Sequence, residues 1–281
     1  MYTSKIAALA LLVPGMLVAA SPIFKNNGTL KGWDGTNHEH KGTVSEVNDQ
    51  SYSPETSIKV VQTYDPSYTG RYHSEVYKEG VYKVGDDGYY GFAFRLDPKW
   101  DTSHGQSYNI AQFISNLKDN PDNTCKDDWI PSGMIWVEKD QLYIRSKGGN
   151  MCKSVLKKYT IGTVKPGQWH RVVLQAKWRS DSTGYYKVWF DGKEVLEKSN
   201  IITTYNDSQK KYGFQFRTGL YANGWHDDKH MEGSQGTRQL WIDNVGIGST
   251  YEDADPGSVA GKASRSEMHT EGCGKNWISC L

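Results

Sequence analysis

Short runs of alternating apolar and polar residues recur along most of the chain, separated by glycine, asparagine, aspartate and proline. A period of two predicts β-strands with one buried face, and no long segment has the 3.6-residue period of a helix. The expected strands are residues 57–62, 71–76, 89–96, 108–114, 133–138, 141–145, 168–177, 184–190, 193–196, 211–220 and 238–247. This pattern predicts an all-β fold, a single-domain jelly roll or concanavalin-like two-sheet sandwich with a cleft on its concave face.

The segment 213–228, GFQFRTGLYANGWHDD, combines a core pattern with an unusual polar face. Alternation directs one set of side chains to the core and the other set outward. The inward set is Phe214, Phe216, Thr218 and Leu220, and the outward set is Gln215, Arg217, Gly219 and Tyr221. The outward set places a cation and a phenol on an exposed sheet face, with a glycine gap where a ligand could approach. The alternative is a half-buried strand with a solvated outer face.

The two ends of the chain differ from its body. Lys5, an apolar run over 6–18 and the small residues 18–20 predict a signal peptide over 1–20, and hence a secreted protein. The body is expected over 21–256, and the Gly/Ser/Lys-rich residues 257–281 are expected to form a tail. No other apolar stretch reaches membrane length.

Four cysteines and two glycosylation sequons suit an exported chain. Three cysteine pairings are possible in principle. Proximity favours Cys125 with Cys152, and Cys273 with Cys280, the second pair closing a small loop in the tail. The sequons begin at Asn27 and Asn206.

Charge and aromatic content narrow the class of partner. The chain has 33 Lys and Arg residues, one of which (Lys5) lies in the leader, so the mature balance is 32 basic against 32 acidic residues. This balance argues against nucleic-acid binding. Ten Trp and 18 Tyr residues favour a glycan partner, because exposed aromatic faces stack on sugar rings, although many of them must fill the β core. We expect a monomer that needs no organic cofactor.

Three expected strands carry polar sets that a plain core strand lacks. Alternation places Arg71, His73 and Glu75 on one face, Tyr108 with Gln112 on another, and Arg217 with Tyr221 on a third. Each set also has a structural interpretation. His73 could be a structural group hydrogen-bonded by a neighbour such as Glu75, and Gln112 could satisfy a backbone edge.

Taken together, these sets resemble a known family. RYHSEV (71–76), YNIAQFI (108–114) and FRTGLYANGWHDD (216–228) are similar to motifs of the fungal glucuronan lyases, which are jelly-roll enzymes related more loosely to the alginate-lyase jelly rolls. WHRVVLQAKW (169–178), YYKVWFDGKEVL (185–196) and QGTRQLWIDNVGIGSTYEDADP (235–256) match the same family. The resemblance runs from about residue 24 to residue 256 and leaves out the tail.

The resemblance implies a secreted lyase that cleaves β-1,4-linked polyglucuronate by β-elimination and releases unsaturated oligouronates. Such a lyase neutralises the substrate carboxylate next to C5, a role that similarity gives to Gln112, with Asn109 and Arg71 as helpers. Because the elimination is syn, one residue can serve as base and acid in turn, and we assign this to Tyr221. Arg217 would favour its phenolate. His73 is either the base itself or a hydrogen-bonding partner that tunes Tyr221.

Further binding residues are expected around this set. Trp225 and His226 follow the Tyr221 strand and are expected in a loop at the rim of the cleft, in contact with substrate. The resemblance also implies a structural calcium remote from the chemistry, for which Asp243 and Asn26 are the candidate ligands. Asp243 could instead cap a strand end.

Three other functions are open to a two-sheet sandwich of this kind. A glycoside hydrolase needs two facing carboxylic acids, and sandwich hydrolases often carry Glu-x-Asp-x-x-Glu on one strand. Here Glu138 and Asp140 are followed by Tyr143 in place of the second glutamate, which disfavours hydrolysis. An alginate-type polyuronate lyase and a non-catalytic carbohydrate-binding lectin remain the alternatives.

Overall fold

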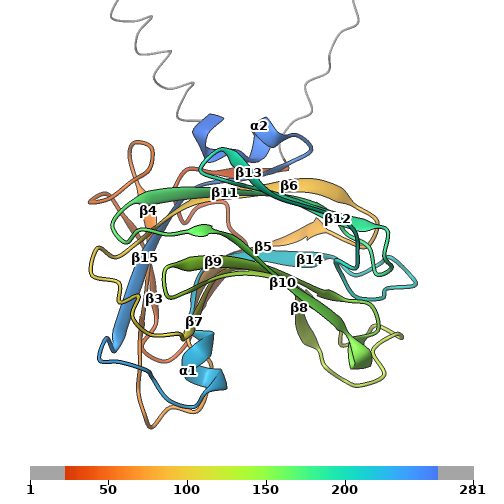
Figure 1. Ribbon diagram of the computed structural model, residues 1–281, viewed down its shortest axis with the longest axis horizontal. Coiled ribbons are helices and arrows are strands. Elements are labelled where there is room, and N and C mark those ends of the chain that lie inside the picture. Colours follow the sequence, from red (N-terminus) through yellow and green to blue (C-terminus); the bar gives the residue numbers. More distant parts are fainter. Residues whose placement is uncertain (1–22, 259–281) are drawn as a thin grey trace, which may run out of the picture.

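The computed structural model describes residues 23–258, in which two antiparallel β-sheets pack face to face (Figure 1). The outer sheet runs β13 (Lys193–Ile201), β12 (Gly184–Phe190), β11 (Trp169–Lys177), β6 (Asp87–Leu96), β15 (Thr237–Gly248), β4 (Ser57–Thr63) and β3 (Thr43–Val47), and β1 (Phe24–Asn26) pairs with β15. The inner sheet runs β10 (Val155–Thr163), β9 (Gln141–Gly148), β8 (Trp129–Glu138), β7 (Ser107–Asn116), β14 (Phe214–Tyr221), β5 (His73–Tyr82) and β2 (Gly35–His38). The all-β jelly-roll prediction is confirmed.

Each of the expected strands exists, with ends shifted by a few residues. The strands that the sequence pattern missed are β1, β2, β3 and β10. β10 has the sequence VLKKYTIGT and is mostly exposed at the edge of the inner sheet, so its lysines conceal the alternation. Edge strands are commonly charged in this way, because charge discourages pairing with other chains.

Helical segments are short. They are the 3₁₀ turn Met151–Lys153, α1 (Asn223–Asp227) beside the inner sheet and α2 (Tyr251–Ala254) on the outer sheet. Within residues 23–258, no helix is long and apolar enough to cross a membrane.

The core between the sheets is strongly aromatic. Phe214, Phe216 and Leu220 of β14 are buried there, which confirms the inward face expected for this strand. Tyr82 stacks on Trp178 with ring centroids 4.1 Å apart and tilts against Phe214 at 4.4 Å. Because this face of β14 packs into the core, the other face of the strand lies on the side of the inner sheet away from the core.

Gly219 serves the strand pairing and leaves no gap for a sugar, so that expectation was wrong. Its φ is +145°, and a Cβ placed there would lie 2.4 Å from the carbonyl oxygen of Ser74 on β5. Only glycine allows the two backbones to approach this closely.

The expected Cys125–Cys152 disulfide is not formed in the structure, where both residues are exposed free thiols. The two side chains are nevertheless neighbours. A hydrogen bond between them raises the pKa of Cys125 and lowers that of Cys152. The expected signal peptide and the Cys273–Cys280 loop lie outside the described residues.

Candidate active site

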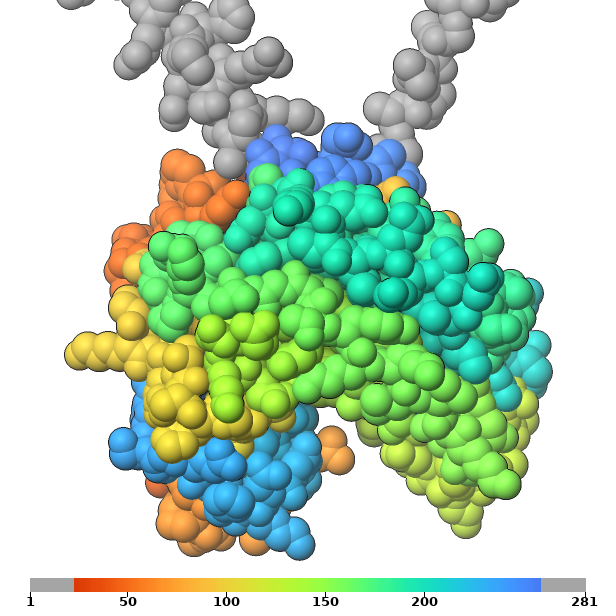
Figure 2. Space-filling model, viewed as in Figure 1, coloured from red at the N-terminus to blue at the C-terminus, as the bar shows by residue number. Residues whose placement is uncertain are grey.

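A cleft of about 740 Å³ crosses the concave face of the inner sheet. Figure 2 shows it as the hollow on the lower side of the molecule, between the part coloured yellow and blue and the part coloured green. Its lining includes the cations Arg71, Arg145, Lys147 and Arg217 and the carboxylates Glu39, Asp127, Asp128 and Asp227. The cleft therefore offers several cations to an anionic ligand.

Tyr221 and His73 meet in this cleft. They are direct partners in the β14–β5 pairing, and their rings stack with centroids 4.0 Å apart and an interplanar angle of 28°. Directly opposed residues on one sheet face pack side by side in this way. The contact is a stacking contact, so the hydrogen bond proposed between His73 and Tyr221 is absent.

His73 is held by a residue that the sequence did not single out for this task. Its Nδ1 lies 3.0 Å from Oε2 of Glu39, whereas its Nε2 lies 3.9 Å from Oε2 of Glu75. Burial raises the pKa of Glu39, but the hydrogen bond and charge of His73 and the charge of Arg71 outweigh it and hold the pKa below its usual value. A hydrogen on Nδ1 would be donated to Glu39, which would leave Nε2 as the acceptor.

Tyr221 is a neutral phenol. Burial and the charges of Asp227, Glu75 and Glu39 raise its pKa well above the usual value, and Arg71 is the cation that opposes them. Its hydroxyl has no hydrogen-bond partner among the described residues, so it is available to a ligand. Stabilisation of a phenolate by Arg217 is therefore not what this geometry provides.

Arg217 is positioned by its own neighbours on the cleft floor. Its Nε donates to Oε1 of Gln215 at 2.9 Å, and its Nη1 lies 4.0 Å from Oε2 of Glu75. The guanidinium also lies over the ring of Trp129, 5.4 Å from the centroid. These contacts aim a fixed cation into the cleft.

Gln112 is bound to a buried carboxylate. Its Nε2 lies 2.7 and 2.9 Å from the two oxygens of Glu75, whose exposed fraction is 0%. The donor end of Gln112 is therefore engaged in this structure, although the sequence had assigned it to the substrate carboxylate. The Gln112–Glu75 pair is a rigid part of the floor, because a buried carboxylate without such a donor would be costly.

Asn109 does not reach the cleft, so its predicted substrate contact is wrong. The β7–β8 pairing shifts between Asn109 and Ala111, which marks a β-bulge. With its amide oriented to satisfy its hydrogen bonds, Asn109 donates to the carbonyls of Ala111 and Ile135 at 2.9 Å each. The extra residue also reverses the faces, so that Tyr108 packs edge-on against Trp225 in the core while Gln112 faces the cleft.

Trp225 and His226 are likewise not cleft residues. The segment after Tyr221 is a helix and not the expected loop, and α1 turns Asn223 and Asp227 toward the cleft. Trp225 points to the other side and is 1% exposed. His226 lies outside the lining, with Nδ1 3.2 Å from the carbonyl of Gly70. Positions four apart share a helix face, which explains this division.

Replacing Trp225 with alanine should therefore destabilise the protein without weakening ligand binding directly. Trp225 packs edge-on against Tyr72, Tyr64 and Tyr108 at 5.2, 5.5 and 5.9 Å. Loss of so large a buried side chain should lower the free energy of unfolding by about 3–5 kcal/mol. Urea unfolding measures this, with Trp225→Phe as the milder control. Unchanged stability together with weaker ligand binding would show that Trp225 is a cleft residue after all.

Arg145 is the cleft residue that the sequence reasoning missed most clearly. It has no hydrogen bond or ion pair to any residue within 23–258, and its Nε is buried without a partner. Burial lowers its pKa, and the neighbouring Tyr205 and Asp227 oppose this. The alternating polar face of β9, with Tyr143, Arg145 and Lys147, was the available signal. A cleft cation that makes no direct ion pair or hydrogen bond suits an anionic ligand.

The candidate calcium ligands are already occupied by hydrogen bonds. Asp243 is buried, and its carboxylate accepts from the backbone N–H groups of Tyr52, Ser53 and Asn244 at 2.8, 3.1 and 2.7 Å. Burial raises its pKa, although these three bonds lower it.

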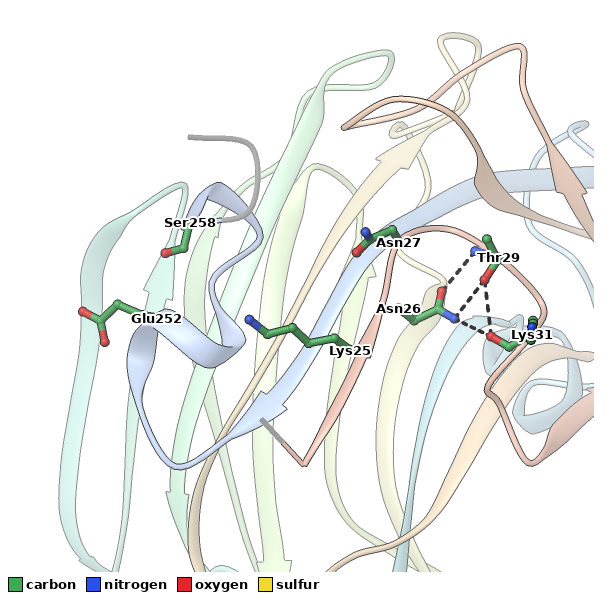
Figure 3. Close-up of a pocket in the computed structure, with 7 residues that line it drawn as sticks. All are labelled: Lys25, Asn26, Asn27, Thr29, Lys31, Glu252 and Ser258. Carbon is green, nitrogen blue, oxygen red and sulfur yellow. Dashed lines mark hydrogen bonds between the residues drawn. The ribbon is translucent and has the colours of Figure 1, made fainter. Parts of the chain in front are cut away.

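Asn26, the last residue of β1, is engaged in the same way, as Figure 3 shows. Its side-chain oxygen accepts from Thr29 and its nitrogen donates to the Lys31 carbonyl. Across 23–258 there is no group of three or more His, Cys, Asp or Glu suited to a metal. Calcium binding at Asp243 and Asn26 stays a prediction.

The two sequon asparagines are accessible to differing degrees. Asn27 is exposed at the pocket in Figure 3, and Asn206 is half-buried. Their glycosylation stays a prediction.

A family model and a solved structure both match this chain to polysaccharide lyases. The family model described as polysaccharide lyase matches residues 25–246. A crystal structure of an endo-β-1,4-glucuronan lyase from the fungus Trichoderma reesei is 49% identical to this chain, with a TM-score of 0.78, and the match covers 84% of this chain and 99% of that one.

A more distant structural match shares the fold alone. The marine PL-14 alginate lyase from Aplysia kurodai has a TM-score of 0.55 at 9% identity, over 82% of this chain and 100% of its own. No curated protein matches the chain.

Proposed function

The chain belongs to the polysaccharide lyase family, and from that premise we propose that it cleaves β-1,4-linked polyglucuronate by β-elimination. The observation that carries the substrate is the 49% identity to an endo-β-1,4-glucuronan lyase over nearly all of that enzyme. The chemistry is supported by the arrangement of His73, Tyr221 and several cations in one cleft.

Elimination requires three things of the cleft. The C5 proton of a uronate is weakly acidic, so the adjacent carboxylate must be stabilised as negative charge builds up on it. A base must then accept the C5 proton, and an acid must protonate the departing O4. In glucuronate both groups lie on the same side of the ring, so the base and the acid must be neighbours.

His73 and Tyr221 provide this pair. Nε2 of His73 accepts the C5 proton, the C5–H electrons form the C4–C5 double bond, and the C4–O4 bond breaks. The Tyr221 hydroxyl gives its proton to O4, and no water is consumed. The imidazolium that forms lies between Glu39 and Glu75, at 3.0 and 3.9 Å, which stabilise its charge. The raised pKa of Tyr221 favours the acid role in place of the dual role first expected.

Stabilisation of the substrate carboxylate is assigned to the cleft arginines. Arg145 makes no direct ion pair within the described chain, and Arg217 is held over Trp129 with Glu75 at 4.0 Å. Arg71 joins them from the segment just before β5. Gln112 fixes Glu75, and with it the positions of Arg217 and His73.

Replacing Gln112 with alanine should lower kcat by roughly 10²-fold, because Glu75, and with it Arg217 and His73, would no longer be held in position. It should also lower the free energy of unfolding by about 1–3 kcal/mol, because Glu75 loses its donor. Initial rates and urea unfolding measure the two effects.

The double variant Gln112→Ala/Glu75→Gln separates them. Removing the buried charge should restore stability without restoring activity. If activity returned together with stability, neither Gln112 nor the charge of Glu75 would be needed for catalysis.

The alternatives differ in measurable ways. Initial rates on polyglucuronate, alginate and other polyuronates compare the proposed substrate with the alginate-type alternative. We expect polyglucuronate to be cleaved fastest, and a preference for alginate would overturn the substrate assignment. A lectin would bind without cleaving.

Secretion, the two disulfides and glycosylation are part of the same proposal. A polymer such as polyglucuronate is met outside the cell, and the leader predicted over 1–20 would deliver the enzyme there. In that oxidising compartment Cys125 and Cys152, already neighbours, would join.

A further inference from the structure

One row of paired residues in the inner sheet runs from His73 and Tyr221 to Trp136 and Tyr143, which lie outside the cleft lining. His73 pairs with Tyr221, Tyr221 with Asn109, Asn109 with Trp136, and Trp136 with Tyr143. The row therefore crosses β5, β14, β7, β8 and β9 at right angles to the strands. With neighbouring strands about 4.8 Å apart, Trp136 and Tyr143 lie on the order of 10 and 14 Å from Tyr221 along this row.

Trp136 and Tyr143 face the same side of the sheet as the cleft. Met134 on β8 and Arg145 on β9 line the cleft, and Trp136 and Tyr143 are each two positions from them on the same strands. Side chains two apart on a strand share a face. The side chain of Asn109, between them and Tyr221, is turned into the β7 bulge. It therefore does not separate the two aromatic residues from the cleft.

The two rings form an aromatic pair with a cation over it. Trp136 and Tyr143 stack at 5.4 Å with an interplanar angle of 26°. Nζ of Lys158, on the adjacent β10, lies 3.7 Å from the Tyr143 centroid and 5.2 Å from the Trp136 centroid. The ammonium also pairs with Glu138 at 3.1 Å, and Lys158 is 42% exposed. Both rings are half-buried, so they are neither core residues nor isolated surface residues.

We propose that Trp136, Tyr143 and Lys158 form a second binding site for the same polysaccharide, which holds a uronate residue remote from the bond that is broken. The site rests on the proposed function, because its ligand is a neighbouring part of the polyuronate substrate. An aromatic face packs against the C–H face of a pyranose ring, and the ammonium pairs with the uronate carboxylate in place of Glu138. Arg145, which pairs with Lys158 across β9 and β10, links this site to the cleft.

The test compares substrate lengths. In Trp136→Ala and Lys158→Ala, kcat/KM on long polyglucuronate should fall roughly three- to tenfold, because KM rises while kcat is unchanged. On the shortest oligoglucuronate that the enzyme cleaves, kcat/KM should be unchanged. An equal loss on both lengths, or no loss on the polymer, would overturn the site.

Matched controls lie on the outer sheet. Trp189 is half-buried and packs edge-on against Tyr251 at 5.0 Å, and Lys187 pairs with Glu197 at 3.1 Å, the distance of the Lys158–Glu138 pair. Trp189→Ala and Lys187→Ala should leave both substrates unaffected. A loss on the polymer in these controls equal to that in the test variants would also overturn the site.

A binding measurement separates this site from the proposed function. Titration of polyglucuronate into Tyr221→Phe, with and without Trp136→Ala, reports the site without turnover. If the unmodified protein binds polyglucuronate but releases no unsaturated product, the proposed function fails. The second site then stands if Trp136→Ala weakens that binding, and fails if it does not.

Discussion

Tyr221→Phe should reduce kcat on polyglucuronate by roughly 10³-fold or more while the protein stays folded and binds its substrate. The substitution removes one oxygen. That hydroxyl has no hydrogen-bond partner among residues 23–258, so its loss leaves no buried group unpaired. The ring, stacked on His73 at 4.0 Å, is retained. Only the proton donor to O4 is lost.

The measurement is the initial rate of unsaturated-product formation, with urea unfolding and substrate titration as controls. Tyr77→Phe is a matched variant, since Tyr77 is a half-buried tyrosine of β5 that does not line the cleft. It should have the activity of the unmodified enzyme. A near-normal rate for Tyr221→Phe would remove Tyr221 from the mechanism.

The pH profile tells which proton step Tyr221 performs. Burial and the charge of Asp227 raise its pKa above the usual value of about 10, so it is protonated throughout the neutral range. An acid must be protonated to act. Tyrosine deprotonation should therefore limit kcat only above about pH 10. A phenolate base would instead make kcat rise about tenfold per pH unit up to that pKa.

His73→Asn should have the second largest effect, a loss of roughly 10²–10⁴-fold in kcat. Asparagine keeps a polar group near Glu39 but has no basic nitrogen to take the C5 proton. Glu39→Gln should cost less, because Glu39 acts only through its 3.0 Å contact with Nδ1 of His73. Initial rates at saturating substrate measure both.

Added imidazole provides a control for the role of His73. In His73→Ala, where the missing ring leaves space, imidazole should restore part of the rate, because it supplies the lost base. If His73→Asn kept most of the activity, Tyr221 would be the base and His73 only its stacking partner.

Much of the fold was predictable because, in a two-sheet sandwich, apolar and polar residues alternate wherever a strand has one buried face and one solvated face. The inward face of β14 was found from Phe214, Phe216 and Leu220 alone. β10 was missed because four residues of its outer run, Val155 to Lys158, are all exposed and do not alternate in polarity. A strand with two solvated faces does not show this alternation of apolar and polar residues.

The candidate site was predictable in part, because polar residues inside a strand need a reason to be there. His73, Gln112, Arg217 and Tyr221 do line one cleft. Asn109 was misassigned because its amide is buried and bonded to the carbonyls of Ala111 and Ile135, across a bulge that sequence does not show. Trp225 was misassigned because a turn of helix places Asn223 and Asp227 at the rim instead.

Long-range contacts could not have been read from the sequence. Glu39 holds His73 across 34 positions, and Glu75 holds Gln112 across 37. The raised pKa of Tyr221 likewise depends on burial and on Asp227, which only the folded chain brings together. These contacts decide which residue is the acid and which is the base.

The most direct test is to incubate the protein with polyglucuronate and follow two signals at once, the ultraviolet absorbance of unsaturated uronate and the number of new reducing ends. β-Elimination forms one C4–C5 double bond for each chain break, so we expect the two signals to rise in equal amounts. Reducing ends without absorbance would mean hydrolysis. Binding with neither signal would mean a lectin, and either result would contradict a polyglucuronate lyase.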